Sequence, residues 1–293
     1  MNKFQKIAKN VISSLVVAGC IFAIALLIEG IIGIANWTQK DHSIHLFGSS
    51  KKTKTEKTDP NLTTYSDIES INITTSNYEL VVTIDPKISE TKLTYESNTG
   101  KVSVGVEDKE LIVRQRKSYN PLTMFKNRDK IQKDGVIYLT LPNNFTLKKA
   151  TFELGSAKSK IENLSAEQLS LTTDDGETVA SGIYAKAVTA NTGEGVTKFE
   201  NVSFDTFSLD GGKGNVSFSG TLYTSADLKV DSGDLTFLVY ASRDYFGINV
   251  DRGEGQVLID GSDYESVPLT ENGTHFINVS NEEGKCNLTF QPM

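Results

Sequence analysis

Short runs of alternating apolar and polar residues dominate the chain from Asp67 onward. The runs are rich in β-branched residues and are bounded by Gly, Asn, Asp or Pro, as in "SINITT", "ELVVTI", "TKLTYES", "KVSVGV", "ELIVRQ" and "VIYLTLP". Alternation with a period of two is typical of strands, and the bounding residues favour turns. No long amphipathic helical pattern follows residue 66. The pattern therefore predicts an all-β domain over residues 67–293.

A repeat of 19 residues organises these strands. One turn position recurs at this interval, at Ala157, Gly176, Gly195, Gly214 and Gly233. Apolar residues follow four positions later, at Ile161, Ala180, Phe199, Phe218 and Phe237. A second apolar column runs through Leu171, Ala190, Leu209 and Leu228, and a second turn column through Asn163, Gly182, Asn201 and Gly220. Two strand segments and two corners per repeat predict a single-stranded β-solenoid, with regular coils over about residues 154–262.

Less regular coils are predicted at both ends of this array. "TTSNYELVV", from Thr74, resembles a first coil. "DRGEGQVLIDGS", from Asp251, repeats the layout of "DGGKGNVSFSGT", from Asp210, and is expected to continue the array after a short insertion. "NEEGKCNLTF", from Asn281, is expected to form the last coil.

The glycine-rich turns also resemble a calcium-binding β-roll, most clearly in "LDGGKGNVSFSG" at residues 209–220. The calcium repeat is nine residues long and needs an aspartate two positions after its third glycine, where this chain has Val216. The residue before the turn position varies from coil to coil and is Lys213 in the middle of the array, which would repel a cation. We therefore predict no metal site, and expect the glycines to serve the backbone by adopting positive φ angles.

The N-terminus carries a targeting signal. Lys3, Lys6 and Lys9 precede an apolar run, residues 11–37, in which Glu29 is the only charge. As a helix rising about 1.5 Å per residue, this run exceeds the roughly 30 Å hydrocarbon core. Lysines before the run place residues 1–10 in the cytoplasm. The sequence thus predicts a single-pass anchor in the cell membrane, with an extracytoplasmic C-terminal region.

Two other readings of the N-terminus stay open behind this one. A cleaved secretory signal, with Gly33 and Ala35 before the cut, ranks second. A lipoprotein signal ranks third, with Cys20 of "VAGC" as the lipidated residue. All three export the rest of the chain. Residues 38–66 are polar, without a sustained period, and are expected to form a tether.

The strand and turn motifs together resemble those of the bacterial "putative-adhesin" family, a domain of unknown function shared by envelope-stress proteins of the LiaG type. The resemblance covers about residues 66–293 and rests on "IESINITTSNYELVV", on "GVIYLTLP" ending at Pro142, and on the coils "NTGEGV" and "DGGKGNV". Ala157 and the shortened "DSGDL" at residues 231–235 depart from the pattern. The resemblance implies an extracytoplasmic β-solenoid without established catalytic residues, often encoded beside small membrane proteins and transcription regulators.

Composition narrows the possible functions. The net charge of −7 argues against non-specific nucleic-acid binding, and two cysteines form no disulfide framework. Cys286 is expected to be an inert packed thiol. The acids Asp174, Asp175 and Glu177 cluster at one corner, but neighbouring coils do not repeat them, which favours a solvated turn. No catalytic, phosphate-binding or zinc motif occurs, so no catalytic residue and no cofactor is predicted.

One basic segment differs from its surroundings. Residues 114–133 contain seven basic residues and a single acid, Asp129. The basic residues are Arg114, Arg116, Lys117, Lys126, Arg128, Lys130 and Lys133. The segment lies between two predicted strands, so we expect a long hairpin loop with exposed Tyr119, Met124 and Phe125. Its composition suits contact with anionic lipid or an anionic wall polymer. The alternative is a solvated insertion.

These observations favour a non-enzymatic, membrane-anchored module of the bacterial cell envelope that acts in interaction or sensing, including an envelope-stress response. Its partners would be envelope membrane proteins, anionic lipid or wall polymer, or a second copy of the chain, and not nucleic acid. A surface adhesin is the first alternative. A β-solenoid enzyme acting on polysaccharides is the second.

Overall fold

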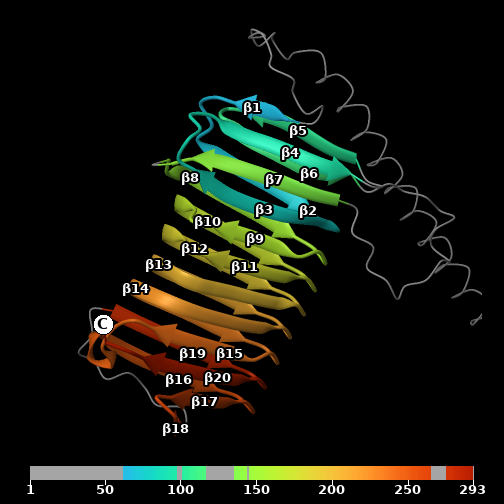
Figure 1. Cartoon of the computed structure of the whole chain (residues 1–293). Coiled ribbons are helices and arrows are strands. Elements are labelled where there is room, and N and C mark those ends of the chain that lie inside the picture. Colours follow the sequence, from blue (N-terminus) through green and yellow to red (C-terminus); the bar gives the residue numbers. More distant parts are fainter. Residues whose placement is uncertain (1–61, 98–100, 117–134, 144, 265–274, 293) are drawn as a thin grey trace, which may run out of the picture. The chain divides into compact units, whose positions relative to one another are not determined.

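A computed structural model describes residues 62–97, 101–116, 135–143, 145–264 and 275–292 (Figure 1). These residues form twenty strands and one short 3-10 helix, Arg243–Tyr245, which confirms the predicted all-β class. Within this part of the chain, no helix is long and apolar enough to cross a membrane. The predicted cytoplasmic segment, the predicted anchor and most of the predicted tether lie outside the described residues.

The central coils repeat as predicted. The strands from Leu147 to Val239 pair in parallel along the array, mostly with partners 19 residues away, as Ser165 does with Tyr184 and Val196 with Asn215. The interval is 18 at Val202, which pairs with Gly220, and returns to 19 at Thr206. Each coil has a short segment and a long segment, which pair with the corresponding segments of the neighbouring coils, and we call the two arrays the short-strand sheet and the long-strand sheet. β13 and β14 each run without a break through both. The strands are β8 (Leu147–Leu154), β9 (Ser159–Glu162), β10 (Ser165–Thr173), β11 (Glu177–Ser181), β12 (Tyr184–Thr192), β13 (Val196–Gly211), β14 (Asn215–Val230) and β15 (Leu235–Val239).

The N-terminal coils follow a different order from the predicted one. The coil of β2 (Ser70–Thr75) and β3 (Tyr78–Asp85) pairs with β8 and β9 on one side. On its other side it pairs in parallel with β6 (Glu110–Arg116) and β7 (Gly135–Pro142), so the coil from Ser70 is the second in space and not the first.

Antiparallel strands continue both sheets beyond this outermost coil. β5 (Lys101–Glu107) pairs with β6, while β4 (Thr91–Ser97) pairs with β7 and with β1 (Thr63–Tyr65). β1 begins four positions before Asp67, so the folded region includes the end of the sequence assigned to the tether. The antiparallel strands give this end of the solenoid a structure that the repeat does not contain.

The C-terminal coils are also interchanged. The coil of β19 (His275–Asn281) and β20 (Lys285–Phe290) pairs with β14 and β15 on one side and with β16 (Phe246–Arg252) and β17 (Gln256–Ile259) on the other (Figure 1). After β15 the chain therefore passes over one coil position and forms the terminal coil, β16–β17. The later strands β19 and β20 occupy the position that was passed over. The predicted order, with the coil from Asp251 next and that from Asn281 last, is wrong. The short strand β18 (Ser262–Asp263) forms a hairpin with β17.

Glycine is needed in the first turn column for a different reason from the predicted one. Its members stack directly on one another, so that a methyl group on Gly195, Gly214 or Gly233 would collide with the carbonyl oxygen of the residue one coil before. None of these three residues has a positive φ. The positive φ angles lie in the second turn column, at Asn163 (56°), Gly182 (63°) and Asn201 (53°). Close approach of neighbouring coils, and not a left-handed turn, thus requires glycine at the first corner.

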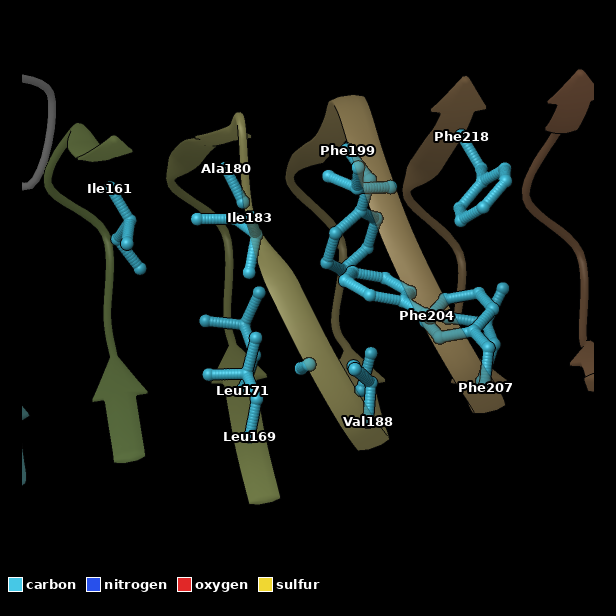
Figure 2. Close-up of a cluster of buried hydrophobic side chains, with 14 of the residues drawn as sticks. Ile161, Leu169, Leu171, Ala180, Ile183, Val188, Phe199, Phe204, Phe207 and Phe218 are labelled. Atoms are coloured by element: carbon cyan, nitrogen blue, oxygen red, sulfur yellow. The ribbon is translucent and has the colours of Figure 1, made fainter. Parts of the chain in front are cut away.

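Inward-facing side chains of the two sheets form one core (Figure 2). In the parallel ladder Phe218 lies between Phe199 and Phe237, as predicted, and it is 1% exposed. Its ring stacks on that of Phe237, with centroids 4.3 Å apart, and lies 5.5 Å from that of Phe207. Aromatic contacts of this kind stabilise the fold beyond the burial of apolar surface alone. They also favour the observed register between neighbouring coils.

Candidate functional site

The strands on either side of the predicted basic segment do not form a hairpin. β6 and β7 do not pair with each other, because each pairs in parallel with one strand of the β2–β3 coil. The expected hairpin is therefore wrong. Arg114 is exposed on β6, and Arg116 ends that strand. Lys117, Lys126, Arg128, Lys130 and Lys133 lie outside the described residues.

Gln115 attaches the start of this segment to the neighbouring corner. Its side-chain oxygen Oε1 accepts hydrogen bonds from the backbone N–H groups of Ser76, at 2.6 Å, and Asn77, at 3.0 Å. Backbone donors at a corner lack a partner in the ladder, so these bonds stabilise the β2–β3 turn. This contact could not be predicted from the sequence, because 39 residues separate Gln115 from Ser76.

The acidic corner of the central coils has the character of a solvated surface. Asp174 and Asp175 are exposed. Glu177 Oε2 lies 2.8 Å from Lys158 Nζ, and Glu177 Oε1 lies 3.4 Å from Lys198 Nζ. These ammonium groups lower the pKa of Glu177, first through hydrogen bonds and then through their charge. Over the described ranges, no group of three or more His, Cys, Asp and Glu side chains is arranged to hold a metal ion.

Cys286 lies in the inward column, between Leu235 and Val257. Burial raises the pKa of its thiol to about 12. Since the thiolate is the nucleophilic form, this side chain is unreactive near neutral pH, in agreement with the expected packed thiol.

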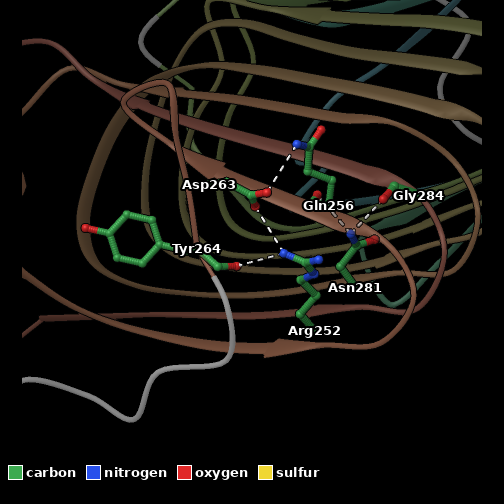
Figure 3. A network of polar contacts seen from close by, with 6 residues as sticks. All are labelled: Arg252, Gln256, Asp263, Tyr264, Asn281 and Gly284. Atoms are coloured by element: carbon green, nitrogen blue, oxygen red, sulfur yellow. Dashed lines mark hydrogen bonds and ion pairs between the residues drawn. The ribbon is translucent and has the colours of Figure 1, made fainter.

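The terminal coil has a polar network at its glycine corner (Figure 3). Arg252 Nη1 donates to Asp263 Oδ1 at 3.1 Å and to the carbonyl oxygen of Tyr264 at 3.4 Å. The buried Asn281 Nδ2 donates to the carbonyl oxygens of Gln256, at 3.1 Å, and Gly284, at 2.7 Å. Three of the acceptors are backbone carbonyl oxygens, and that of Gly284 also accepts a hydrogen bond from the backbone N–H of Gln256, at 3.0 Å. We therefore assign the network to the attachment of the terminal β16–β17 coil to the β19–β20 coil.

The outer face of the long-strand sheet carries an open polar groove of about 430 Å³ across β13, β14, β19 and β16. Two rows of outward-facing side chains run across these four strands in register. One row is Ser208, Asp227, Asn278 and Asn249, and the other is Asp210, Lys229, Ser280 and Asp251. We call these eight residues the polar rows. Asn278 Nδ2 donates to Asp227 Oδ1 at 2.6 Å, and Lys229 Nζ lies 3.8 Å from Asp210 Oδ1.

Exposed aromatic side chains accompany one end of the polar rows. Phe276, two residues before Asn278 on β19, is 41% exposed. Its ladder partners are Ser225 of β14 and Gly247 of β16. Tyr223 and Tyr245, two residues before those partners, are 52% and 62% exposed. We call Phe276, Tyr223 and Tyr245 the aromatic group.

Sequence reasoning missed this face because it depends on the order of the coils. The predicted order would have set Asn249 and Asp251 directly beside Asp227 and Lys229, with Asn278 and Ser280 beyond them. The observed order places β19 in the middle, so that Phe276 pairs with Ser225 on one side and with Gly247 on the other. Each of these partners follows an exposed tyrosine by two residues, Tyr223 on β14 and Tyr245 at the end of the 3-10 helix.

The comparisons with known proteins concern family and fold. A family model described as Toastrack DUF4097 matches residues 33–289. A solved "putative cell adhesion protein" from Clostridium sporogenes ATCC 15579 is 14% identical, covering 79% of this chain and 98% of its own, with a TM-score of 0.37. A "putative adhesin" from Bacteroides fragilis NCTC 9343 is 15% identical, with coverages of 79% and 98% and a TM-score of 0.39. A "putative lipid binding protein" from Parabacteroides distasonis ATCC 8503 is 15% identical, with coverages of 78% and 97% and a TM-score of 0.44. No curated protein matches the sequence.

Proposed function

Because this chain belongs to the Toastrack DUF4097 family, we propose that it is a non-enzymatic interaction module of the bacterial cell envelope. Membership of the family confirms the resemblance found in the sequence motifs. The observation that carries the proposal is the outer face of the C-terminal coils. There the polar rows line an open groove on four paired strands, and the exposed Phe276 follows on β19 two residues before Asn278.

A rigid sheet is well suited to present such a surface. β14 and β19 are each paired on both sides, so the side chains of the polar rows project from a backbone whose hydrogen bonds are already made. Side chains held this way lose little conformational freedom when a partner binds. Contiguous exposed apolar residues next to polar groups mark interaction sites on many proteins.

The acidic residues of this face support binding over hydrolysis. Glycoside hydrolysis needs two carboxyl groups that converge on one bond, one of them kept protonated by its surroundings. Asp227 accepts a hydrogen bond from Asn278, and Asp210 pairs with Lys229, so the two carboxylates are engaged separately. Asp227 and Asp251 lie on strands that β19 separates.

We place this module outside the cytoplasmic membrane, held by residues 11–37 as a single-pass anchor. A tether of residues 38–62, which ends where β1 begins, would span about 25–30 Å as a flexible chain, which favours contacts close to the membrane over long-range adhesion. The β6–β7 coil and the terminal β16–β17 coil are at opposite ends of the strand order. The basic segment at the first end suits anionic lipid or wall polymer, and the polar rows at the other end suit a second partner.

Sedimentation with cell walls tests this proposal. Purified full-length chain in detergent micelles is mixed with insoluble wall material from a Gram-positive and a Gram-negative bacterium. We expect the chain to sediment with at least one wall preparation and to release no soluble sugar from it. Release of soluble oligosaccharide would support the enzyme alternative, and absence from both pellets would contradict a wall-binding module.

A further inference from the structure

The polar rows and the aromatic group have the chemistry of a saccharide site. On that basis, and resting on the proposed function, we infer that the outer face of β14, β19 and β16 binds a neutral saccharide chain. A pyranose ring has an apolar C–H face and a rim of hydroxyl groups. The C–H face packs on the negative face of an aromatic ring, and the hydroxyl rim needs donors and acceptors in the same plane. Phe276, with Asn278 two residues further along the strand, offers both.

The polar rows match the hydrogen bonding of hydroxyl groups. A sugar hydroxyl donates one hydrogen bond and accepts others, so its site needs both kinds of partner. Asp227 and Asp251 supply carboxylate acceptors, while the amides of Asn278 and Asn249 supply a donor and an acceptor each. Because they stand on neighbouring strands about 4.8 Å apart, they can contact successive hydroxyl groups of a chain that lies across the sheet.

Charge selects the class of saccharide. The residues lining the groove include Asp210, Asp227 and Asp251 but a single cation, Lys229, which gives a net charge of −3 + 1 = −2. A surface of this sign repels anionic polymers such as polyphosphates and polyuronates. The groove therefore suits a neutral chain, whereas the basic segment at the other end of the strand order would attract an anionic one.

The ladder also excludes a peptide that adds as a strand to β14 or β19. Peptides that extend a sheet use the free backbone groups of an edge strand. β14 and β19, which carry Tyr223, Asp227, Phe276 and Asn278, are both paired on two sides. Only side chains are available on this face, which favours a ligand recognised by stacking and hydroxyl contacts.

The test uses full-length chain in detergent micelles and three insoluble probes: chitin and cellulose, which are neutral, and cross-linked polygalacturonate, which is anionic. We expect retention on at least one neutral probe and none on polygalacturonate. Phe276→Ala and Asn278→Ala should each weaken retention by tenfold or more. Tyr184→Ala is the matched control, because Tyr184 is a 44% exposed aromatic residue on β12, a strand that carries no member of the polar rows.

Three results would overturn the inference. The chain could be retained on polygalacturonate alone, it could be retained on none of the probes, or the Phe276→Ala variant could be retained as well as the original chain. Thermal unfolding of each variant shows whether a loss of retention comes from a loss of fold. For a misfolded Phe276→Ala variant, Phe276→Tyr supplies the answer, since it keeps the ring and should keep retention. Full-length chain that sediments with cell walls but fails on both neutral polysaccharides would refute the saccharide site and leave the proposed function standing.

Discussion

Asn278 donates a hydrogen bond to Asp227 across 51 residues of sequence, from β19 to the neighbouring strand β14. This contact exists because the last coil in the sequence, β19–β20, lies between the β14–β15 coil and the terminal β16–β17 coil. It also joins the two central members of one polar row. The position of β19–β20 between these two coils therefore determines both the order of the coils at this end of the solenoid and the residues that meet in the candidate site.

Engineered disulfides test the coil order. Asp227→Cys with Asn278→Cys should form a disulfide on mild oxidation, because neighbouring strands lie about 4.8 Å apart, within the range for bridging. Asp227→Cys with Asn249→Cys should not, since β19 separates their strands and about 7 Å between Cα atoms is the upper limit. Mass spectrometry of tryptic peptides distinguishes the pairs. The reverse result would support the order predicted from the repeat.

The repeat made the central coils predictable, but not the order of the terminal ones. Phe199, Phe218 and Phe237 recur at the coil period, and each coil can pair only with its neighbours in sequence. At the C-terminus, Gly255 and Gly284 stand at equivalent corners. Either coil could stack on Gly233 by this pattern. Local sequence then leaves the order undecided, and packing between distant segments determines it.

The glycine column shows a second limit of sequence reasoning. Glycine is required either for a positive φ or for close backbone approach, and a turn pattern does not separate the two reasons. Ala157 in the same column was a signal against positive φ, since alanine rarely adopts it. The side chains of the candidate site were still harder to predict, because Phe276 pairs with β14 and with β16 only through the insertion of β19 between them.

Replacement of a stacked glycine tests the close-approach explanation. In Gly214→Ala the new methyl group would meet the backbone carbonyl of Gly195, which cannot move without shifting a paired coil. We expect a loss of more than about 1 kcal/mol in the free energy of unfolding, measured by urea denaturation. Gly105→Ala is the control, because an added methyl group there meets no atom within 4 Å. A near-neutral Gly214→Ala would contradict the stacking.

Acid unfolding tests the ion pairs of Glu69. Hydrogen bonds from Lys109 and Lys148 lower the pKa of this carboxyl group from 4.5 to about 2. A lowered folded-state pKa stabilises the fold above about pH 4.5, and this contribution is lost as the pH falls toward about 2. Glu69→Gln should lower the urea midpoint at pH 6 and flatten its pH dependence between these values. The side chain of Glu69 is partly exposed to solvent, at 34%, so salt should reduce the difference.

Glu254→Gln provides the control for this measurement, because Glu254 is an exposed residue at the terminal corner. It should leave the pH dependence as in the original chain. If Glu69→Gln at low salt loses stability with falling pH as the original chain does, then the contacts of Glu69 with the two lysines do not stabilise the fold.

The basic segment predicts binding to anionic membranes. The chain as a whole carries a net charge of −7, so attraction to an anionic surface requires a local concentration of cations. Each Lys or Arg near such a surface contributes on the order of 1 kcal/mol, and seven of them fall within residues 114–133. We expect residues 38–293 to bind vesicles of phosphatidylglycerol and not of phosphatidylcholine, and expect binding to weaken with added salt.

Seven substitutions to glutamine, at Arg114, Arg116, Lys117, Lys126, Arg128, Lys130 and Lys133, should abolish this vesicle binding. Thermal stability should stay the same. Among the seven residues, the structure describes the side chain of Arg114 alone, and this side chain is exposed and lies outside the core. Replacement of Lys158, Lys160 and Lys198, which pair with acids on the central coils, should leave vesicle binding intact. Equal binding by the seven-fold variant would reduce the segment to a solvated insertion at the β6–β7 corner.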